Sequence, residues 1–364
     1  MKVAVDEQIF ALQKHGGISR LFYEVMKQYV ANPDLDVDLL PFARPIINDY
    51  VLTDPQLRDV LNPKGSKTTA QGLFRQAMPG QFDSQAEVVH HTFYLPPGLY
   101  RYKNAKRIVT VYDMIPELMR NTKRRLDFAT RKRKFLEAAD HVICISQSTL
   151  NDVQRIWPDL QVPMSVVYLG ANPAFNPNAV LDPTLPSRYV LHVGNRSGYK
   201  DAWSLTQAFT RIAGDYPDVT LLYVGGGEPT PDERKQWASL GGGDRIKWIS
   251  ATEDQLPSIY AQAELCVVPS RYEGFGLPTL EGLASGAPQI LADTSSLPEV
   301  GGVAARYYTP GNSAQLAEHM NAVLSDPNER ARLRELGLAQ AAQFSWEKTA
   351  RDTAAIYRQA LNQA

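Results

Sequence analysis

Two glutamates on either side of a glycine-rich turn are the residues best suited to chemistry in this 364-residue sequence. Glu273 and Glu281 flank the stretch Gly274-Phe275-Gly276-Leu277-Pro278, which follows an apolar run at 265–268. The pattern predicts a short buried strand, a tight turn and a helix with the proline in its first turn. A helix that begins at the end of a strand presents unpaired N–H groups and a positive dipole end, so we expect an anion site.

The two carboxylates require an explanation of their own, because negative charges do not favour a phosphate beside them. We interpret Glu273 and Glu281 as hydrogen-bond acceptors for hydroxyl groups on either side of bound phosphates. The alternative is that Glu273 is a loop residue bonded to nearby N–H groups and that Glu281 faces solvent on its helix. The glycine and proline pattern favours the ligand interpretation.

This segment resembles the nucleotide-sugar site of the retaining glycosyltransferases of family 4, which have the GT-B fold. Glu273 and Glu281 match the paired glutamates of that family, and Ser-Ser-Leu-Pro-Glu-Val at 295–300 matches its next signature. The resemblance implies that Glu273 contacts the transferred sugar and Glu281 the ribose, while the N–H groups at 275–277 hold sugar hydroxyls and the second phosphate. The donor-binding residues of this segment would then be Glu273, Gly274, Phe275, Gly276, Leu277 and Glu281.

A second loop supplies the cations that the glutamate segment lacks. The apolar run at 189–194 predicts a strand, and Arg196 and Lys200 follow it before an amphipathic helix. Fixed cations stabilise the charge that builds on a leaving nucleoside diphosphate as its glycosidic bond breaks. The alternative is a pair of surface charges on a loop. By the same resemblance, Arg196 and Lys200 form a diphosphate clamp and, with Glu273, are the predicted catalytic residues.

The amino-terminal part begins with a similar pattern. A predicted strand at 2–5 is followed by Gly16 and Gly17, which open an amphipathic helix. A glycine pair alone is a weak sign of a phosphate site, because paired glycines usually belong to an ordinary loop. In the family that the chain resembles, a Gly-Gly pair at this point lies against the donor's diphosphate, so we expect the same of Gly16 and Gly17.

Polar and aromatic residues at the ends of two further predicted strands are candidates for contacts with the acceptor or the sugar. Open α/β sheets bind ligands at the carboxyl ends of parallel strands. The candidates are His90, His91, Tyr112 and Asp113, each of which could instead be structural or merely exposed. The family commonly has a histidine where this chain has Tyr112, so either Tyr112 or one of the neighbouring histidines takes that role.

The family resemblance also suggests where the nucleobase binds. It packs near the strand at 246–250, so Ile249 and Leu256 are candidates, with ordinary core packing as the alternative. The preceding strand ends in Gly225-Gly226-Gly227, which lacks the spacing of a dinucleotide-binding fingerprint.

A basic run at 120–134 contains eight Lys or Arg residues and a single acid, Asp127. It predicts either a solvated helix face or contact with an anionic inner-membrane surface that carries the acceptor. Each basic residue near such a surface contributes about 1 kcal/mol.

Composition limits the protein class. The chain is 44% hydrophobic with a net charge of −1, which favours a globular protein with two domains and no bulk attraction to nucleic acid. Cys144 and Cys266 lie in apolar runs and indicate a reducing compartment. Neither a signal-peptide pattern nor a membrane-length apolar run is present. We expect a cytoplasmic protein, peripheral at the inner membrane if the basic run docks there.

Two Rossmann-like α/β domains are predicted on either side of the proline-rich stretch 171–186. By resemblance they form a GT-B fold and face a central cleft. We expect an acceptor-binding domain at 1–172, a nucleotide-sugar-binding domain at 187–344, and a helix at 345–364 that crosses back to the first domain.

The resulting hypothesis is a retaining hexosyltransferase that needs neither a metal nor a cofactor. It resembles bacterial mannosyltransferase-like enzymes of surface polysaccharide synthesis, so GDP-mannose is the first expected donor and a saccharide or lipid-linked saccharide the acceptor. The alternatives are a UDP-sugar-dependent hexosyltransferase, a GT-B sugar-nucleotide epimerase and a non-catalytic sugar-nucleotide-binding partner of another transferase.

Overall fold

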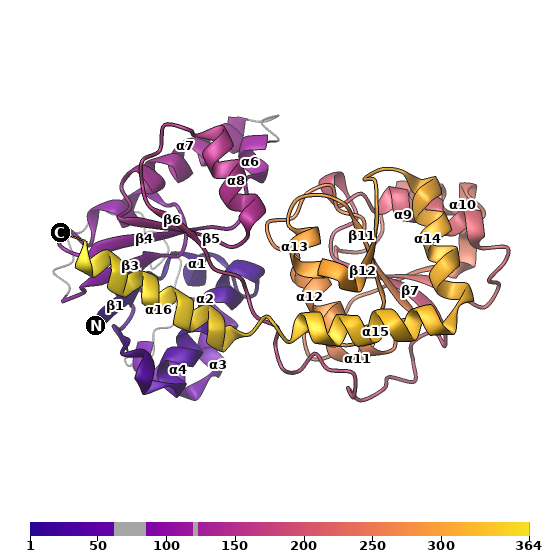
Figure 1. Ribbon diagram of the computed structural model, residues 1–364, viewed down its shortest axis with the longest axis horizontal. Helices are drawn as coiled ribbons and strands as arrows, with labels where there is room; N and C mark the ends of the chain where they lie inside the picture. The colour runs from indigo at the N-terminus through magenta and orange to yellow at the C-terminus, as the bar shows by residue number, and fades with distance from the viewer. Residues whose placement is uncertain (62–84, 119–122, 364) are drawn as a thin grey trace. The chain divides into compact units, whose positions relative to one another are not determined.

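The computed structural model describes residues 1–61, 85–118 and 123–363, which divide into two compact units (Figure 1). Unit 1 consists of Met1–Gly170 and Trp346–Ala364, and unit 2 of Ala171–Ser345. The stretch at 171–186 that we predicted to be a linker is therefore part of unit 2. Each unit contains one six-stranded parallel sheet, which confirms the predicted α/β class.

The sheet of unit 1 has the strand order β2-β1-β3-β4-β5-β6. Its strands are β1 (Lys2–Val5), β2 (Asp38–Leu39), β3 (Val88–His91), β4 (Lys106–Val111), β5 (His141–Cys144) and β6 (Met164–Val166). Every residue of β3 and β5 is buried, as is typical of parallel strands covered on both faces. The chain returns from edge strand β2 to place β3 beside β1, so the strand order reverses between β1 and β3.

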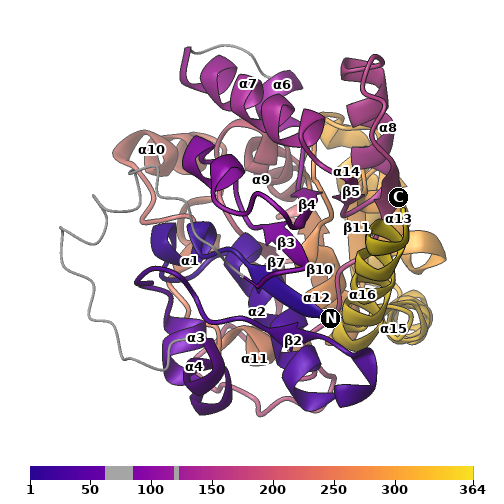
Figure 2. The ribbon, with the colours of Figure 1, turned by 90° about the vertical axis from the view of Figure 1, so that its left-hand side faces the viewer.

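Helices cover both faces of this sheet. They are α1 (Gln8–Leu12), α2 (Gly17–Ala31), α3 (Asp49–Thr53), α4 (Pro55–Leu61), α6 (Ile115–Leu118), α7 (Lys123–Glu137), α8 (Gln147–Ile156) and α16 (Trp346–Asn362). Consecutive strand residues point to opposite faces. The His90 ring meets Phe22 of α2 and Tyr357 of α16, whereas the His91 ring meets Phe135 of α7. Helices α2 and α16 therefore cover one face and α7 the other (Figures 1 and 2).

The sheet of unit 2 has the strand order β12-β11-β10-β7-β8-β9. Its strands are β7 (Tyr189–Val193), β8 (Thr220–Val224), β9 (Ile246–Ile249), β10 (Leu265–Val268), β11 (Gln289–Ala292) and β12 (Ala305–Tyr308). The chain runs outward from β7 to β9 and then returns to β10 beside β7. The order thus reverses between β7 and β10, and open α/β sheets bind ligands at such a switch point.

Two buried clusters anchor the helices of unit 2 to opposite faces of its sheet. The helices are α9 (Ala202–Ile212), α10 (Pro231–Ser239), α11 (Leu256–Ala261), α12 (Leu277–Ala284), α13 (Leu297–Gly301), α14 (Ser313–Ser325) and α15 (Pro327–Ala341). Leu205 of α9 and Leu316 of α14 pack in one cluster, and Ile259 of α11 packs in the other. Within the part of the chain that the structure describes, no helix has both the length and the apolar character needed to cross a bilayer.

Candidate functional site

Lys200 and Glu273 meet beside the switch point of unit 2. Lys200 ends a short 3-10 turn, Gly198–Lys200, in the loop after β7, and Glu273 lies in the loop after β10. The Nζ atom of Lys200 is 2.7 Å from Oε1 and 3.0 Å from Oε2 of Glu273. Their side chains are 18% and 10% exposed. The structure thus brings together two predicted catalytic residues that are 73 positions apart.

The backbone of Glu273 is held by two serines of the signature at 295–300. The N–H of Glu273 donates to Ser295 Oγ at 2.8 Å, and Ser296 Oγ donates to the carbonyl of Glu273 at 3.0 Å. Ser295 adopts a φ of 50°, which is uncommon for a residue other than glycine. This signature therefore orients the Glu273 loop, a role that its sequence pattern alone did not reveal.

Helix α12 begins where the resemblance places the phosphate and sugar contacts. Gly276 precedes its first residue with a φ of 97°, a conformation that favours glycine. A Cβ at Gly276 would also lie 3.1 Å from Leu297 Cδ2. The first turn of the helix carries no acidic side chain, so the positive end of its dipole suits an anion.

Glu281 lies on the buried side of α12. It is 7% exposed, and the hydroxyl of Tyr260 donates to its Oε2 atom at 3.3 Å. The alternative that this glutamate faces solvent is therefore wrong. A buried carboxylate bonded to a tyrosine can accept a further hydrogen bond from a ligand hydroxyl.

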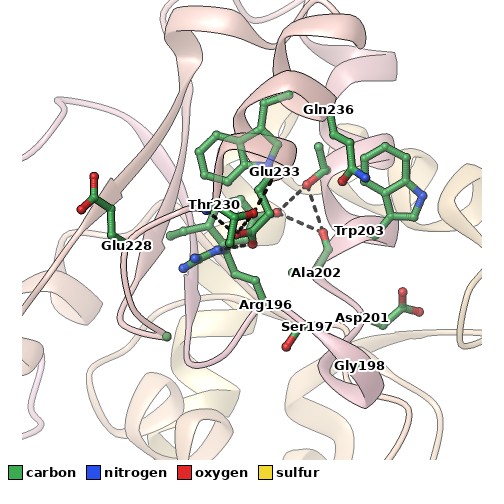
Figure 3. A pocket seen from close by; sticks show the side chains of 14 residues that line it. Arg196, Ser197, Gly198, Asp201, Ala202, Trp203, Glu228, Thr230, Glu233 and Gln236 are labelled. Carbon is green, nitrogen blue, oxygen red and sulfur yellow. Dashed lines mark hydrogen bonds and ion pairs between the residues drawn. The ribbon is translucent and has the colours of Figure 1, made fainter.

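Arg196 points toward the loop between β8 and α10 (Figure 3). Its Nε donates to Glu233 Oε1 at 2.9 Å, its Nη1 to the carbonyl of Gly225 at 2.9 Å, and its Nη2 to the carbonyl of Gly227 at 3.0 Å. A guanidinium group has five N–H donors, so two remain for a ligand. Among the residues described, Arg196 makes no ion pair with Glu273. The two cations of the predicted clamp are therefore in separate ion pairs, Arg196 with Glu233 and Lys200 with Glu273.

The triple glycine makes this arrangement of Arg196 possible. Gly225, Gly226 and Gly227 have φ values of 80°, 71° and 78°. A Cβ at Gly226 would lie 2.6 Å from the carbonyl oxygen of Gly194, so a side chain would push apart the loops after β7 and β8. The sequence pattern excluded a dinucleotide fingerprint but gave no sign that these carbonyls bind Arg196.

Glu233 is a further residue of the site that the sequence analysis missed. Thr230 and Glu233 form a capping box at the start of α10, in which Glu233 Oε2 accepts from the N–H of Thr230 at 2.8 Å. Burial raises the pKa of the Glu233 carboxyl, but hydrogen bonds from Arg196 and Thr230 outweigh it and hold the pKa below its ordinary value. Glu233 therefore ties Arg196 to a rigid helix terminus.

Two pockets in unit 2 lie beside the predicted site residues. Arg196 and Glu233 line a pocket of about 540 Å³ between α9 and α10 (Figure 3). Ile249 lines another of about 430 Å³, together with Ser250 and Gln255. Leu256 does not line either pocket and instead packs against the apolar cluster that contains Ile259.

Gly16 and Gly17 lie in unit 1, where they begin α2. Gly16 precedes the helix in an extended conformation, and its carbonyl accepts hydrogen bonds from the Arg20 N–H and the Ser19 hydroxyl. Their expected contact with a diphosphate stays a prediction.

His90 and His91 are both buried in unit 1. His90 Nδ1 lies 2.6 Å from the hydroxyl of Tyr357, and its Nε2 lies 2.7 Å from that of Thr110. Burial lowers the pKa of His90 to about 3, so its ring is neutral near neutral pH. His91 Nδ1 lies 2.7 Å from Asp6 Oδ2.

Tyr112 and Asp113 differ in accessibility. Tyr112 is buried, and its hydroxyl donates to the carbonyl of Thr92 at 2.8 Å. Asp113 is half-buried and accepts from the Ile115 N–H at 2.9 Å through Oδ1. Of the four candidates in unit 1, only Asp113 is not buried, and it remains the most accessible candidate for a substrate contact.

Asp6, absent from our sequence-based candidates, is central to this end of the unit 1 sheet. Its carboxylate accepts from the N–H of Thr92 at 2.9 Å and from the Gln8 amide at 2.6 Å, in addition to pairing with His91. Burial raises the pKa of Asp6, but the hydrogen bond and charge of His91, with help from Thr92, outweigh it and lower the pKa below its ordinary value.

The basic run at 120–134 lies mostly on α7, although Arg120 falls outside the described residues. Lys132 is 2% exposed and pairs with Glu117 at 2.9 Å. The prediction that the whole run forms a basic surface is therefore wrong for Lys132, because this side chain is buried and pairs with Glu117 inside unit 1. Lys134 is exposed, and so is the apolar Leu126 on the same helix.

Comparison with protein families identifies the glutamate and cation segments together. A family model described as "Glycosyl transferases group 1" matches residues 180–339, a range that contains Arg196, Lys200, Glu273 and Glu281. This match confirms the resemblance to a glycosyltransferase domain for residues 180–339.

Two curated relatives are mannosyltransferases. The chain is 33% identical over 178 residues to O-antigen chain mannosyltransferase B of Escherichia coli, covering 47% of this chain and 45% of that protein. It is 37% identical over 149 residues to the MMP alpha-(1->4)-mannosyltransferase of Mycolicibacterium hassiacum, covering 40% of this chain and 36% of that protein. The chain thus spans less than half the length of these relatives.

Solved structures share the fold across nearly the whole chain. The sucrose-phosphate synthase of Thermosynechococcus elongatus has a TM-score of 0.73 at 21% identity and covers 98% of both chains. Anabaena HepE in complex with UDP and glucose has a TM-score of 0.68 at 18% identity, covering 98% of this chain and 99% of that one. These likenesses confirm the predicted GT-B fold.

Proposed function

Residues 180–339 belong to the glycosyl transferases group 1 family, and on that premise we propose that the chain transfers a hexose from a nucleotide diphosphate sugar to a saccharide or lipid-linked saccharide. The observation that carries the proposal is the Lys200–Glu273 ion pair beside the acid-free start of α12. It puts a cation and a carboxylate beside the positive end of a helix dipole at one switch point. Those groups match the phosphates and hydroxyls of a sugar nucleotide.

Mannose is the proposed sugar, with GDP-mannose as donor, because two relatives of the chain are mannosyltransferases. The second candidate is a UDP-hexose. It is favoured by the likeness to HepE, which has been solved in complex with UDP-glucose. An acceptor from surface polysaccharide synthesis follows from the relative that builds O-antigen chains.

The proposed reaction retains the configuration of the anomeric carbon. The bond between that carbon and the phosphate oxygen breaks, and a bond to the acceptor oxygen forms on the same face of the sugar. The departing phosphate takes the acceptor's proton. Lys200 and the two remaining N–H groups of Arg196 stabilise the charge of the leaving diphosphate. No metal and no cofactor take part in this proposal.

The other residues have binding roles in this proposal. Glu273 accepts hydrogen bonds from hydroxyls of the transferred sugar, and Glu281 from those of the ribose. Ile249 lies at the pocket proposed for the nucleobase. Gly16 and Gly17 would approach the diphosphate, and Asp113 the sugar or acceptor.

Contact with an anionic membrane surface is part of the proposal for a lipid-linked acceptor in the cytoplasm. Lys134 and the exposed Leu126 of α7 support it, because a cation and an apolar side chain on one helix suit an interfacial position.

A panel of nucleotide sugars tests the function. Purified protein is mixed with each donor and an α-mannoside acceptor, and nucleotide release and product configuration are followed by chromatography and NMR. We expect GDP release and an α-glycoside from GDP-mannose. A free sugar epimer without glycoside would indicate an epimerase. A donor that is bound but never consumed would indicate a non-catalytic partner.

A further inference from the structure

The pocket between α9 and α10 is separate from the paired glutamates of the donor site. Its volume of about 540 Å³ lies within the range of roughly 300–1,000 Å³ that small-molecule sites occupy. Its walls come from the loop after β7, the first turn of α9 and the start of α10 (Figure 3). Arg196 is shared with the proposed diphosphate clamp, but Lys200, Glu273 and Glu281 do not line this pocket.

Charge pairing makes the pocket suitable for a neutral ligand. Each charged side chain in its lining already has an opposite charge: Arg196 pairs with Glu233, Asp201 with Arg271, and Glu228 with Arg234. The guanidinium of Arg196 is further bonded to two carbonyls. An ammonium group would therefore have to break an existing pair, and an anion would find only the two remaining N–H groups of Arg196. The carboxylate oxygens nevertheless keep lone pairs that can accept hydrogen bonds from hydroxyl groups.

Aromatic side chains give the pocket an apolar surface. Trp203, in the first turn of α9, is 40% exposed, which is unusual for so large an apolar side chain. Tyr223 and Trp237 stack with ring centroids 5.5 Å apart and line the inner part of the pocket. An indole face matches the C–H face of a sugar ring, because both are flat and apolar with polar groups at the edge.

Polar side chains complete the lining. Ser197 and Gln236 are exposed and line the pocket, and within the described residues their side chains make no hydrogen bond. In the view of Figure 3, Trp203 and Gln236 appear at one end and Glu228 at the other, with Arg196 and Glu233 between them. Flat apolar surface bordered by acceptors and donors is what a sugar with several hydroxyl groups requires.

We propose that this pocket is a binding site for a neutral saccharide, distinct from the nucleotide-sugar site. The indole of Trp203 packs on a sugar ring. Ser197, Gln236 and the carboxylate of Glu228 bond its hydroxyl groups. The proposal does not depend on which sugar the chain transfers, or on its transferring any.

Titration of the full chain with a neutral α-linked mannotriose and with maltotriose tests the site, with calorimetry and ligand-observed NMR as readouts. We expect one oligosaccharide bound per chain. Trp203→Ala weakens this binding about tenfold or more, because it removes the stacking face, and Trp203→Phe restores part of it. Gln236→Ala, on an exposed position of α10, weakens it without disturbing the fold. Lys235→Ala changes the neighbouring exposed residue outside the pocket lining and leaves binding unchanged.

Several results would overturn the proposal. These are no oligosaccharide binding by the wild-type chain, binding that Trp203→Ala and Gln236→Ala leave intact, or displacement of the oligosaccharide by spermine. Binding of nucleotide sugars is measured on the same samples. A wild-type chain that binds nucleotide sugars but no oligosaccharide contradicts the proposal for this pocket alone. A chain that binds the oligosaccharide but no nucleotide sugar contradicts only the proposed transferase function.

Discussion

The two units differ in how far they bury the ion pair that lies near the strand ends at each switch point. In unit 2, Lys200 and Glu273 are 18% and 10% exposed. In unit 1, the corresponding pair of His91 and Asp6 is 0% and 1% exposed. A partly exposed ion pair can exchange its partner for a ligand, whereas one partner of a buried pair leaves only at a large desolvation cost. This difference in exposure fits the ligand exchange proposed for unit 2 and a structural role for the buried pair of unit 1.

The surroundings of each pair support this distinction. Asp6 also accepts hydrogen bonds from Gln8 and Thr92, so its carboxylate is fully engaged within unit 1. Lys200 has one carboxylate partner, Glu273, among its hydrogen-bond and ion-pair contacts, and the start of α12 follows that glutamate closely in sequence. Because the pair keeps some contact with solvent, a diphosphate can replace Glu273 as the partner of Lys200.

The largest expected effect comes from breaking the unit 2 pair. Lys200→Ala and Glu273→Ala should each lower turnover by about 10³-fold, because the leaving diphosphate loses its cation or the sugar loses its acceptor. Thermal midpoints should stay close to that of the wild type. Arg234→Ala, which removes another ion pair of unit 2 that is more than half exposed, is the matched control and keeps full activity. Near-normal turnover in both site variants would contradict the assignment.

Breaking the unit 1 pair should reverse this pattern. Asp6→Asn leaves His91 without its charged partner inside the unit and is expected to cost about 3–5 kcal/mol of unfolding free energy. Nucleotide-sugar binding by unit 2 should persist at temperatures below the lowered midpoint. The control is Asp59→Asn, in an exposed pair with Arg58, which should cost less than about 1 kcal/mol. Denaturant titration measures both, and equal costs would remove the distinction between the units.

Local patterns in the sequence predicted the turn and helix start of the proposed unit 2 site because their signals are close together. The glycines, the proline and the two glutamates within 273–281 encode the turn and helix start directly. The strand that begins unit 1 was also predicted at its observed bounds, Lys2–Val5, because a buried parallel strand is a continuous apolar run.

Partners distant in sequence could not be predicted in this way. Arg196 meets Glu233 across 37 positions, and the capping box with Thr230 gives Glu233 a sufficient local explanation. His90 meets Tyr357 across 267 positions. A histidine at the end of a strand has the same local sequence whether it faces a ligand or a helix from the far end of the chain, so only the tertiary structure distinguishes the two.

Glu233 offers a finer test of how unit 2 orients its second cation. Glu233→Gln keeps the size of the side chain but removes the charge that holds Arg196, so we expect the Kd of the nucleotide sugar to rise about tenfold. Turnover at saturating donor should fall less. Asp232→Asn, in the same first turn of α10 and exposed, is the matched control. An unchanged Kd in Glu233→Gln would show that Arg196 needs no such support.

Acid should weaken unit 1 through its buried His90. The pKa of His90 is about 3 in the folded protein and 6.5 without burial, so between these values the unfolded chain binds the extra proton. Stability is therefore fully present above pH 6.5 and falls as the pH drops, by about 1.4 kcal/mol per pH unit. Asp6, whose lowered pKa lies below 3.8, contributes only at lower pH.

Two histidine variants isolate this effect. His90→Gln removes the titrating ring and should flatten the pH dependence of unit 1 stability between pH 6.5 and 5, even if the variant is less stable throughout. His15→Gln, at a side chain that is 55% exposed, should leave it unchanged. Amide hydrogen exchange in β3 and β4 reports the stability of unit 1. If His90→Gln kept the wild-type slope, the buried histidine would not be the group through which acid weakens unit 1.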